Sequence, residues 1–381
     1  MTQPLGIYLH IPFCLAKCSY CAFVSQPDAE EFHAPYVAAL CKEIVAVGGD
    51  FNLRGKSVDT VFFGGGTPTV LGAVELAKIL EAVQMTFQLT TDAEVTIEAN
   101  PGTLDQRELT EIKAAGFNRL SIGVQSLDDK VLAAAGRIHT AAQAMEIFRE
   151  ARRTGFENIS LDLMYGLPGQ SLASWRDTMA CAIALHPEHV SAYGLKLEEG
   201  TPLSTAVHAG KTALPDEEDE EAMYDELNSF LPRRGYMRYE ISNFALPGRE
   251  CRHNLKYWHW RPYRGFGVAA HSFISSERFA NTETISEYLQ IMQDGKSPEK
   301  FREKAELGVA MAEYTYLKKR KTAGLDNADF ASVFHCDFHK HFASQLASLK
   351  KRGLIICDGQ TVHLTSLGMK LGNQVFAEFL P

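Results

Sequence analysis

Three cysteines near the N-terminus constrain the possible structure and chemistry of this chain more than any other feature of the sequence. Cys14, Cys18 and Cys21 have the spacing C-x₃-C-x₂-C, within the stretch YLHIPFCLAKCSYC at residues 8–21. A loop this short can bring three thiolates onto one inorganic centre. The apolar segment GIYLHIPF precedes them, so we expect the thiols just past the carboxyl end of a first strand. A four-iron cluster normally takes four cysteines, so three ligands would leave one iron free to bind a small molecule.

Two other uses of these thiols remain open. Structural zinc takes four ligands, and His10 or Cys41 could supply the fourth. Disulfides are disfavoured, because the N-terminal residues MTQPLGIYLH lack the features of a secretion signal and reducing compartments keep thiols free. Spacing favours a cluster over zinc without deciding between them.

Composition narrows the class of protein. The chain of 381 residues is long enough for about two or three domains with filled cores. Its net charge of −9 argues against nucleic-acid binding, which needs a positive field. Since no apolar run is long enough to cross a bilayer, we expect a cytoplasmic protein without a transmembrane segment.

Strand-like and helix-like patterns alternate from residue 6 to residue 198. The expected strands cover residues 6–13, 58–63, 93–101, 118–126, 158–169 and 189–198. The helices between them cover residues 35–47, 71–83, a segment after a capping box of Thr103 and Gln106, 141–153 and 172–185. Such alternation implies parallel strands with right-handed crossovers. Six units suit a partial barrel or a doubly wound sheet rather than a complete eight-unit barrel.

The chemically distinctive residues fall at the carboxyl ends of these strands. They are Cys14, the Gly64–Gly66 turn, Glu98, Gln125 and Asp162. In a barrel that edge carries the ligand site, so we expect these residues to line one cavity. An iron with an open position could chelate the amino and carboxylate groups of S-adenosylmethionine there. Taken singly each residue is weak evidence, because a glycine run is commonly a turn and a strand-end carboxylate is often a helix cap.

The remainder of the chain differs in character. Residues 236–244 are expected to form one further strand, and residues 1–243 the barrel. Residues 244–304 lack barrel periodicity and are interpreted as a connecting segment. Residues 305–381 show helices followed by a hairpin around Asp358–Gly359, typical of a winged-helix-like module. Because the chain is acidic, a packing or partner-binding role suits this module better than DNA binding.

Over essentially its whole length the chain resembles the radical S-adenosylmethionine proteins of the oxygen-independent coproporphyrinogen III oxidase group. The resemblance rests on YLHIPFCLAKCSYC, FFGGGTPT, IEANPGTL, RLSIGVQS, DLMYGLPGQ, the Arg137 region and the C-terminal module. It implies an α/β fold with a partial six-unit TIM-like barrel, and a [4Fe-4S] cluster held by Cys14, Cys18 and Cys21. It further implies that S-adenosylmethionine is bound by Tyr8, Tyr20, Gly65, Gly66, Thr67, Glu98, Gln125, Arg137 and Asp162. Lys196 and His271 fall in segments that line the same cavity.

Within this group the chain is more similar to a haem chaperone branch than to the true oxidases. The cysteine motif of the oxidases continues as C-x-x-C-x-C, whereas Phe23 occupies the last position here. The chain also begins close to the motif, without the preceding segment in which those oxidases make a second S-adenosylmethionine contact. Residues 253–258 match the H-N-x-x-Y-W signature of the chaperone branch.

The resemblance implies a protein that binds haem and passes it to respiratory apoproteins at the membrane face. We expect His253 to contribute to the haem site, with His259 and His271 as rival axial ligands, although a histidine beside tryptophans is more often a hydrogen-bonded packing element. The alternative is a coproporphyrinogen III dehydrogenase, in which a 5′-deoxyadenosyl radical abstracts hydrogen from porphyrinogen propionate chains.

Overall fold

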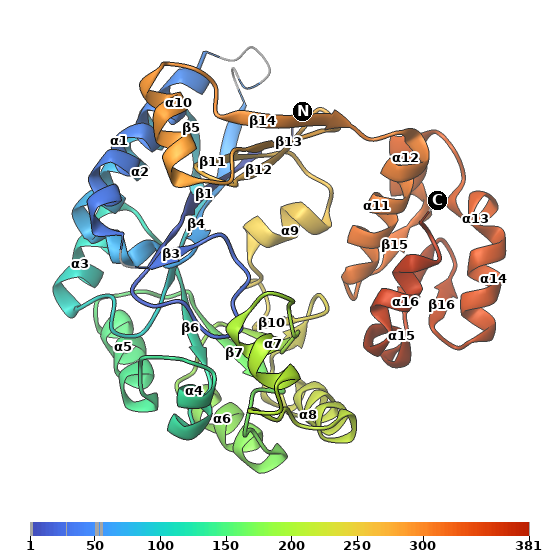
Figure 1. Cartoon of the computed structure of the whole chain (residues 1–381). Helices are drawn as coiled ribbons and strands as arrows, with labels where there is room; N and C mark the ends of the chain where they lie inside the picture. The colour runs from blue at the N-terminus through green and yellow to red at the C-terminus, as the bar shows by residue number, and fades with distance from the viewer. Residues whose placement is uncertain (1–2, 28, 50–52, 54–55, 381) are drawn as a thin grey trace.

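A single large sheet organises the molecule (Figure 1). The computed structural model describes residues 3–27, 29–49, 53 and 56–380. Within them the sheet has twelve strands, in the order β14-β13-β12-β11-β1-β4-β5-β6-β7-β8-β10-β9. Six neighbours run parallel and form the partial barrel, namely β1 (Leu5–Ile11), β4 (Ser57–Gly65), β5 (Gln88–Ala99), β6 (Arg119–Gln125), β7 (Ile159–Tyr165) and β8 (His189–Gly194). The predicted six-unit partial barrel is confirmed.

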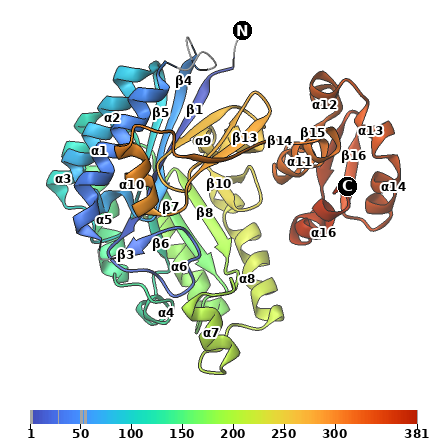
Figure 2. The same ribbon diagram turned by 45° about the horizontal axis from the view of Figure 1, so that its top comes forward.

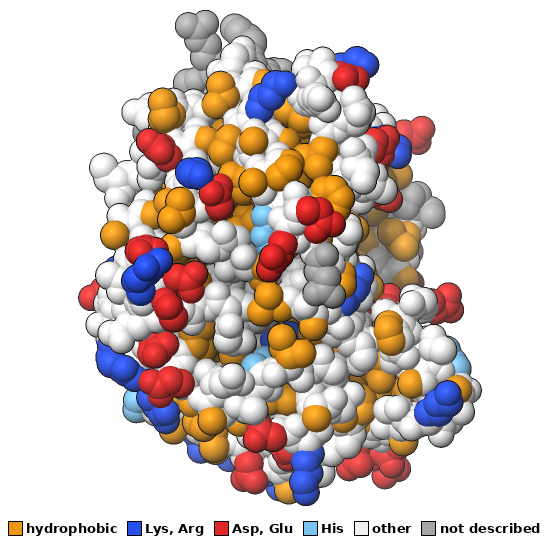
Figure 3. Space-filling model, turned by 60° about the vertical axis from the view of Figure 1, so that its left-hand side comes forward, with side chains coloured by type: hydrophobic (Ala, Val, Ile, Leu, Met, Phe, Trp, Pro, Cys, Tyr) orange, Lys and Arg blue, Asp and Glu red, His pale blue; other side chains and the backbone are white. Residues whose placement is uncertain are grey.

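Helices follow these strands and cover the outer face of the sheet (Figures 1 and 2). They are α1 (Glu30–Val47), α2 (Ala73–Thr86), α3 (Gln106–Ala115), α5 (Ala141–Arg153), α6 (Leu172–Ala184) and α8 (Glu217–Phe230). The short helices α4 (Asp129–Ala134) and α7 (Pro202–His208) lie instead beside the loop of the three cysteines, where Ser19 bonds the Ala135 and Leu203 backbones. In α5 the buried residues Ala144, Ile147, Phe148 and Ala151 recur at helical spacing, so one apolar stripe packs on the sheet. On the face with the left-hand helices of Figure 1, acidic and basic side chains are interspersed (Figure 3).

Two local predictions need correction. The capping box of α3 is made by Asp105 and Glu108 rather than by Thr103 and Gln106, because the helix begins at Gln106. Residues 236–244 form no single strand. They contain the short β9 (Met237–Arg238) and the start of β10 (Asn243–Ala245), which pairs antiparallel with β8.

Residues 244–304, expected as a connecting segment after a barrel at 1–243, contribute strands to the same sheet. After α9 (Arg252–Trp258), β11 (Tyr263–Phe266) pairs in parallel with β1. The sheet then continues antiparallel through β12 (His271–Ile274), β13 (Glu277–Asn281) and β14 (Glu299–Lys304). The strands have four to six residues each, and α10 (Ile285–Gln293) interrupts them before β14, which hides their periodicity. They cover the edge of β1 that would otherwise be unpaired.

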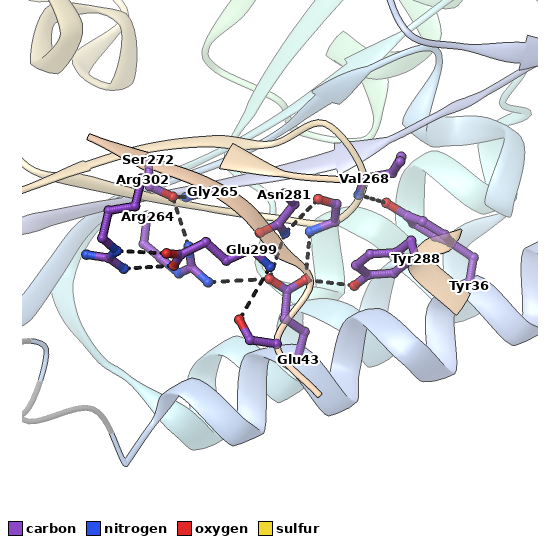
Figure 4. Close-up of polar contacts among 12 residues, drawn as sticks. Tyr36, Glu43, Arg264, Gly265, Val268, Ser272, Asn281, Tyr288, Glu299 and Arg302 are labelled. Atoms are coloured by element: carbon purple, nitrogen blue, oxygen red, sulfur yellow. Dashed lines mark hydrogen bonds and ion pairs between the residues drawn. The ribbon is translucent and has the colours of Figure 1, made fainter. Parts of the chain in front are cut away.

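A buried carboxylate fastens this added part to the barrel (Figure 4). Glu43 of α1 accepts hydrogen bonds from the Gly267 backbone (2.9 Å), the Asn281 amide (2.8 Å) and the Tyr288 hydroxyl (2.7 Å). The Arg264 guanidinium lies 3.5 Å away. Tyr288 belongs to α10 (Ile285–Gln293), which packs on α1. One side chain thus joins α1 to β11, β13 and α10.

The C-terminal module has its own core and stands to one side of the barrel (Figures 1 and 2). It contains α11 (Leu307–Arg320), β15 (Leu325–Asp326), α12 (Asn327–Phe334), α13 (Phe338–His341), α14 (Ala343–Lys351), β16 (Ile355–Asp358), β17 (Thr361–Leu364), α15 (Ser366–Lys370) and α16 (Gly372–Ala377). The predicted hairpin around Asp358–Gly359 is present as β16 and β17. Of the helices in the described part of the chain, none has the length and apolarity needed to cross a bilayer.

Candidate functional site

A cavity of about 460 Å³ opens at the carboxyl ends of the parallel strands. We call it the cysteine cavity. Its lining includes Cys14, Cys18, Tyr20, Cys21, Gly65, Gly66, Thr67, Glu98, Gln125, Arg137 and Asp162. These residues come from the cysteine loop, from β4 to β7 or the turns after them, and from the loop that follows α4. Polar residues at the carboxyl ends of the strands therefore lie in one cavity, as expected, although they are far apart in the sequence.

The cysteine loop is anchored by hydrogen bonds to backbone carbonyls, and these bonds do not use the cysteine sulfurs. The Thr67 amide donates to the Phe13 carbonyl (2.7 Å), and the Ser19 hydroxyl donates to the Ala135 carbonyl (2.9 Å). Gly66 passes so close that a Cβ there would stand 2.5 Å from the Phe13 oxygen and 3.0 Å from the Cys14 sulfur. Only glycine fits this position, and the close approach sets the depth of the cavity beside Cys14.

Two of the three cysteine sulfurs accept hydrogen bonds. Arg137 donates from Nη1 to Cys18 Sγ (3.1 Å) and from Nη2 to Asn100 Oδ1 (2.6 Å). Asn100 in turn donates to Thr67 Oγ1 (2.7 Å), which lies 3.5 Å from Cys14 Sγ. These contacts tie the two sulfurs to Arg137, Asn100 and Thr67 and so fix their positions in the cavity. Asn100 was not predicted from the sequence. It directly follows the last residue of β5, so its position at a strand end could have indicated it.

Neither candidate for a fourth zinc ligand, His10 or Cys41, lines the cysteine cavity. Within the described ranges, no three or more His, Cys, Asp or Glu side chains are grouped so that they could hold one metal ion. A cluster differs, because its cysteines bind different irons and stand apart. Cys41 lies outside the cavity lining, on α1, with its thiol toward the Lys78 carbonyl. Both ring nitrogens of His10 are engaged, by the Tyr8 hydroxyl (3.0 Å) and by the Val24 carbonyl (2.9 Å).

Two buried carboxyl groups give the cavity its electrostatic character. Burial raises the pKa of Glu98 to about 8, and the negative charge of Asp162 contributes to the increase. Burial also raises the pKa of Asp162, although the hydroxyls of Ser121 (3.0 Å) and Ser160 (3.2 Å) donate to it. A cationic ligand would stabilise the ionised form of both groups. The cavity is therefore suited to a molecule with an ammonium or sulfonium group.

Gln125 has a strained backbone at this edge. Its φ of 65° places a non-glycine residue in the left-handed region at the end of β6, where the register with β7 shifts. Such strain is frequently found at ligand sites, because the surrounding structure has to hold it in place. The turn directs the chain so that Gln125 lines the cysteine cavity.

Tyr8 and Lys196 are not among the residues that line the cysteine cavity. Tyr8 lines an adjoining hollow instead, where its ring stacks near Phe62 with the centroids 6.3 Å apart. Lys196 is exposed and pairs with Glu198 at 2.7 Å. Ser121, Met164, Tyr193 and Glu198 do line the cavity and were not predicted, although Ser121, Met164 and Tyr193 lie on barrel strands.

His253, which we expected to contribute to a haem site, has partners for both ring nitrogens within the protein. The side chain is fully buried, and Nδ1 is 2.9 Å from Thr60 Oγ1 while Nε2 is 2.8 Å from Tyr257 Oη. Burial lowers the pKa of His253 to about 3. Both ring nitrogens are occupied, so the residue is a packing element between α9 and β4.

Comparison with known proteins gives consistent matches. Residues 8–182 match the model of the Radical SAM superfamily. The chain is 38% identical to the haem chaperone HemW of Bacillus subtilis over 98% of each chain. It is 33% identical to HemW of Lactococcus lactis over 100% of this chain and 98% of that one. The solved structure of Escherichia coli HemN, titled a coproporphyrinogen III oxidase and radical SAM enzyme, matches with a TM-score of 0.87 and 26% identity, covering 99% of this chain and 90% of that one.

Proposed function

The chain belongs to the HemW family of radical SAM proteins, and on that premise we propose that it is a haem chaperone. It holds a [4Fe-4S] cluster and S-adenosylmethionine, binds haem, and delivers the haem to respiratory apoproteins at the membrane face. The main support is similarity to curated haem chaperones along the full chain rather than in the cofactor domain alone.

The residues of the cysteine cavity fit the two cofactors. Cys14, Cys18 and Cys21 would hold the cluster, which supplies an open iron for the amino and carboxylate groups of S-adenosylmethionine. Glu98 and Asp162 would stabilise the positive charges of that molecule, because both are buried carboxyl groups. Arg137 would orient Cys18 through the hydrogen bond from Nη1 to Sγ.

Glycine and aromatic residues complete this part of the proposal. The backbone of Gly65 and Gly66 allows close approach, and Thr67 orders the loop through its contact with Phe13. Tyr20 is half-buried next to the thiols and would pack against the adenine. Gln125 supplies an amide at the same edge.

One structural likeness favours the alternative function. The fold matches that of a coproporphyrinogen III oxidase over 99% of this chain. Against this stands Phe23, which takes the place of the additional cysteine in the oxidase motif. Its side chain is 69% exposed and lines the cysteine cavity.

We expect purified, anaerobically reconstituted protein to retain haem stoichiometrically through gel filtration. With S-adenosylmethionine and a reductant, we expect no protoporphyrinogen to form from coproporphyrinogen III, because Phe23 replaces the additional cysteine of the oxidase motif. Escherichia coli HemN assayed in parallel is the positive control. Turnover of coproporphyrinogen III at a rate comparable to the control, or failure to retain haem, would overturn the proposal.

A further inference from the structure

A second hollow, of about 490 Å³, adjoins the cysteine cavity. We call it the aromatic hollow and define it by Tyr257, Trp258, Trp260, Phe273, His271 and Arg261. Five separate parts of the chain form its walls: β1, the cysteine loop, α9 and the turn after it, β11 to β13, and Leu317 of α11. Ala22 and Phe23 line both cavities, so the second hollow lies directly behind the loop that follows Cys21.

We propose that the aromatic hollow is the haem site, with His271 as the axial ligand and Arg261 as a partner of the propionates. The inference rests on the proposed function and assigns that function a place separate from the cysteine cavity. The volume lies within the range of about 300–1,000 Å³ that is usual for small-molecule sites. Rings and aliphatic groups line it, as a flat apolar macrocycle requires.

The histidines near the hollow can be separated by their contacts. His10 lines it, but both of its ring nitrogens are engaged, and the ring of His253 is also fully engaged. His259 lines a different cavity, on the other side of Trp260. His271 lines the hollow, is exposed, and within the described ranges has no hydrogen bond to its ring. Imidazole is a common axial ligand of haem iron, so His271 is the histidine of the hollow that is free to bind the iron.

The hollow also offers cationic and polar donors for the carboxylates of haem. Arg261 and Arg278 both line it. Arg278 is already bound by Glu313 through two nitrogens, whereas no carboxylate in the described part of the chain pairs with Arg261. The indole N–H groups of Trp258 and Trp260 are buried and find no acceptor among the described residues. A ligand with carboxylate groups would match this surplus of donors.

The test is a titration of the full-length protein with ferric haem, followed by absorption and electron paramagnetic resonance spectra. We expect His271→Ala to lose the spectrum of histidine-ligated haem and to bind haem at least about tenfold more weakly, since even groups behind a metal ligand change affinity by roughly 10- to 100-fold. Added imidazole should restore the spectrum in the variant. His259→Ala is the matched control and should behave as the wild type.

A second variant tests the propionate contact independently. Arg261→Ala should weaken haem binding by about fivefold, the loss expected of a partly exposed ion pair, without changing the spectrum of the ligated iron. An unchanged spectrum and affinity in His271→Ala would overturn the site while leaving haem binding intact. Absence of haem binding by the wild type would overturn the proposed function and the site together.

Discussion

Replacing Cys14, Cys18 and Cys21 together by alanine is expected to remove all iron and acid-labile sulfide while the chain still folds. The cysteines are only partly buried and belong to none of the apolar core clusters. Their loop is held by contacts that do not use the thiols, such as the Ser19 hydroxyl on the Ala135 carbonyl. Cluster binding should therefore require the thiols, whereas the stability of the barrel should hardly depend on them.

The measurement is metal and sulfide content after anaerobic reconstitution, with thermal unfolding followed by circular dichroism. A matched variant in which Cys181, Cys336 and Cys357 become alanine removes three other thiols and should keep the colour of the wild type. Iron and sulfide retained by the first variant would contradict the assignment of the ligands. Zinc without sulfide in the wild type would show that the site is not a cluster.

Glu43→Ala is expected to destabilise the protein by about 3–5 kcal/mol, the usual cost of breaking a buried ion pair by removing one partner. Glu43 is fully buried, and its carboxylate oxygens accept from Gly267, Asn281 and Tyr288 while Arg264 lies nearby (Figure 4). The substitution leaves these donors without their acceptor and opens a gap between α1 and the strands from β11 onward.

Urea unfolding provides the measurement. Glu31→Ala lies on the exposed face of the same helix and should change the free energy of unfolding by less than about 0.5 kcal/mol. Glu43→Gln keeps an acceptor but loses the charge, so its stability should fall between the two. If Glu43→Ala cost less than about 1 kcal/mol, the network would not be what fastens residues 263–304 to the barrel.

The barrel and the location of its ligand site could be predicted because both follow from local patterns. The sequence pattern of each unit predicts a strand, a turn and a helix, and parallel strands have their carboxyl ends at one edge of the sheet. Glu98 and Asp162 could therefore be placed in one cavity from their positions alone. The same rule, applied fully, would have added Asn100 and Tyr193.

The segment of residues 244–304 could not be predicted in this way. The pairing of β11 with β1 joins residues from opposite parts of the chain, and four-residue strands such as β11 and β12 are too short to show alternation. The partners of His253 could not be predicted for a related reason. Its sequence neighbours indicate an aromatic environment, but they cannot show that Thr60 of β4 occupies one ring nitrogen.

We expect one cavity to hold a cluster with an open iron and S-adenosylmethionine side by side. Electron paramagnetic resonance of the reduced, reconstituted wild type, recorded before and after S-adenosylmethionine is added, tests it most directly. We predict the signal of a reduced four-iron cluster, and we predict that the added molecule changes it, because the molecule binds the iron that lacks a cysteine. A spectrum without that signal, or a signal that S-adenosylmethionine leaves unchanged, would contradict the claim.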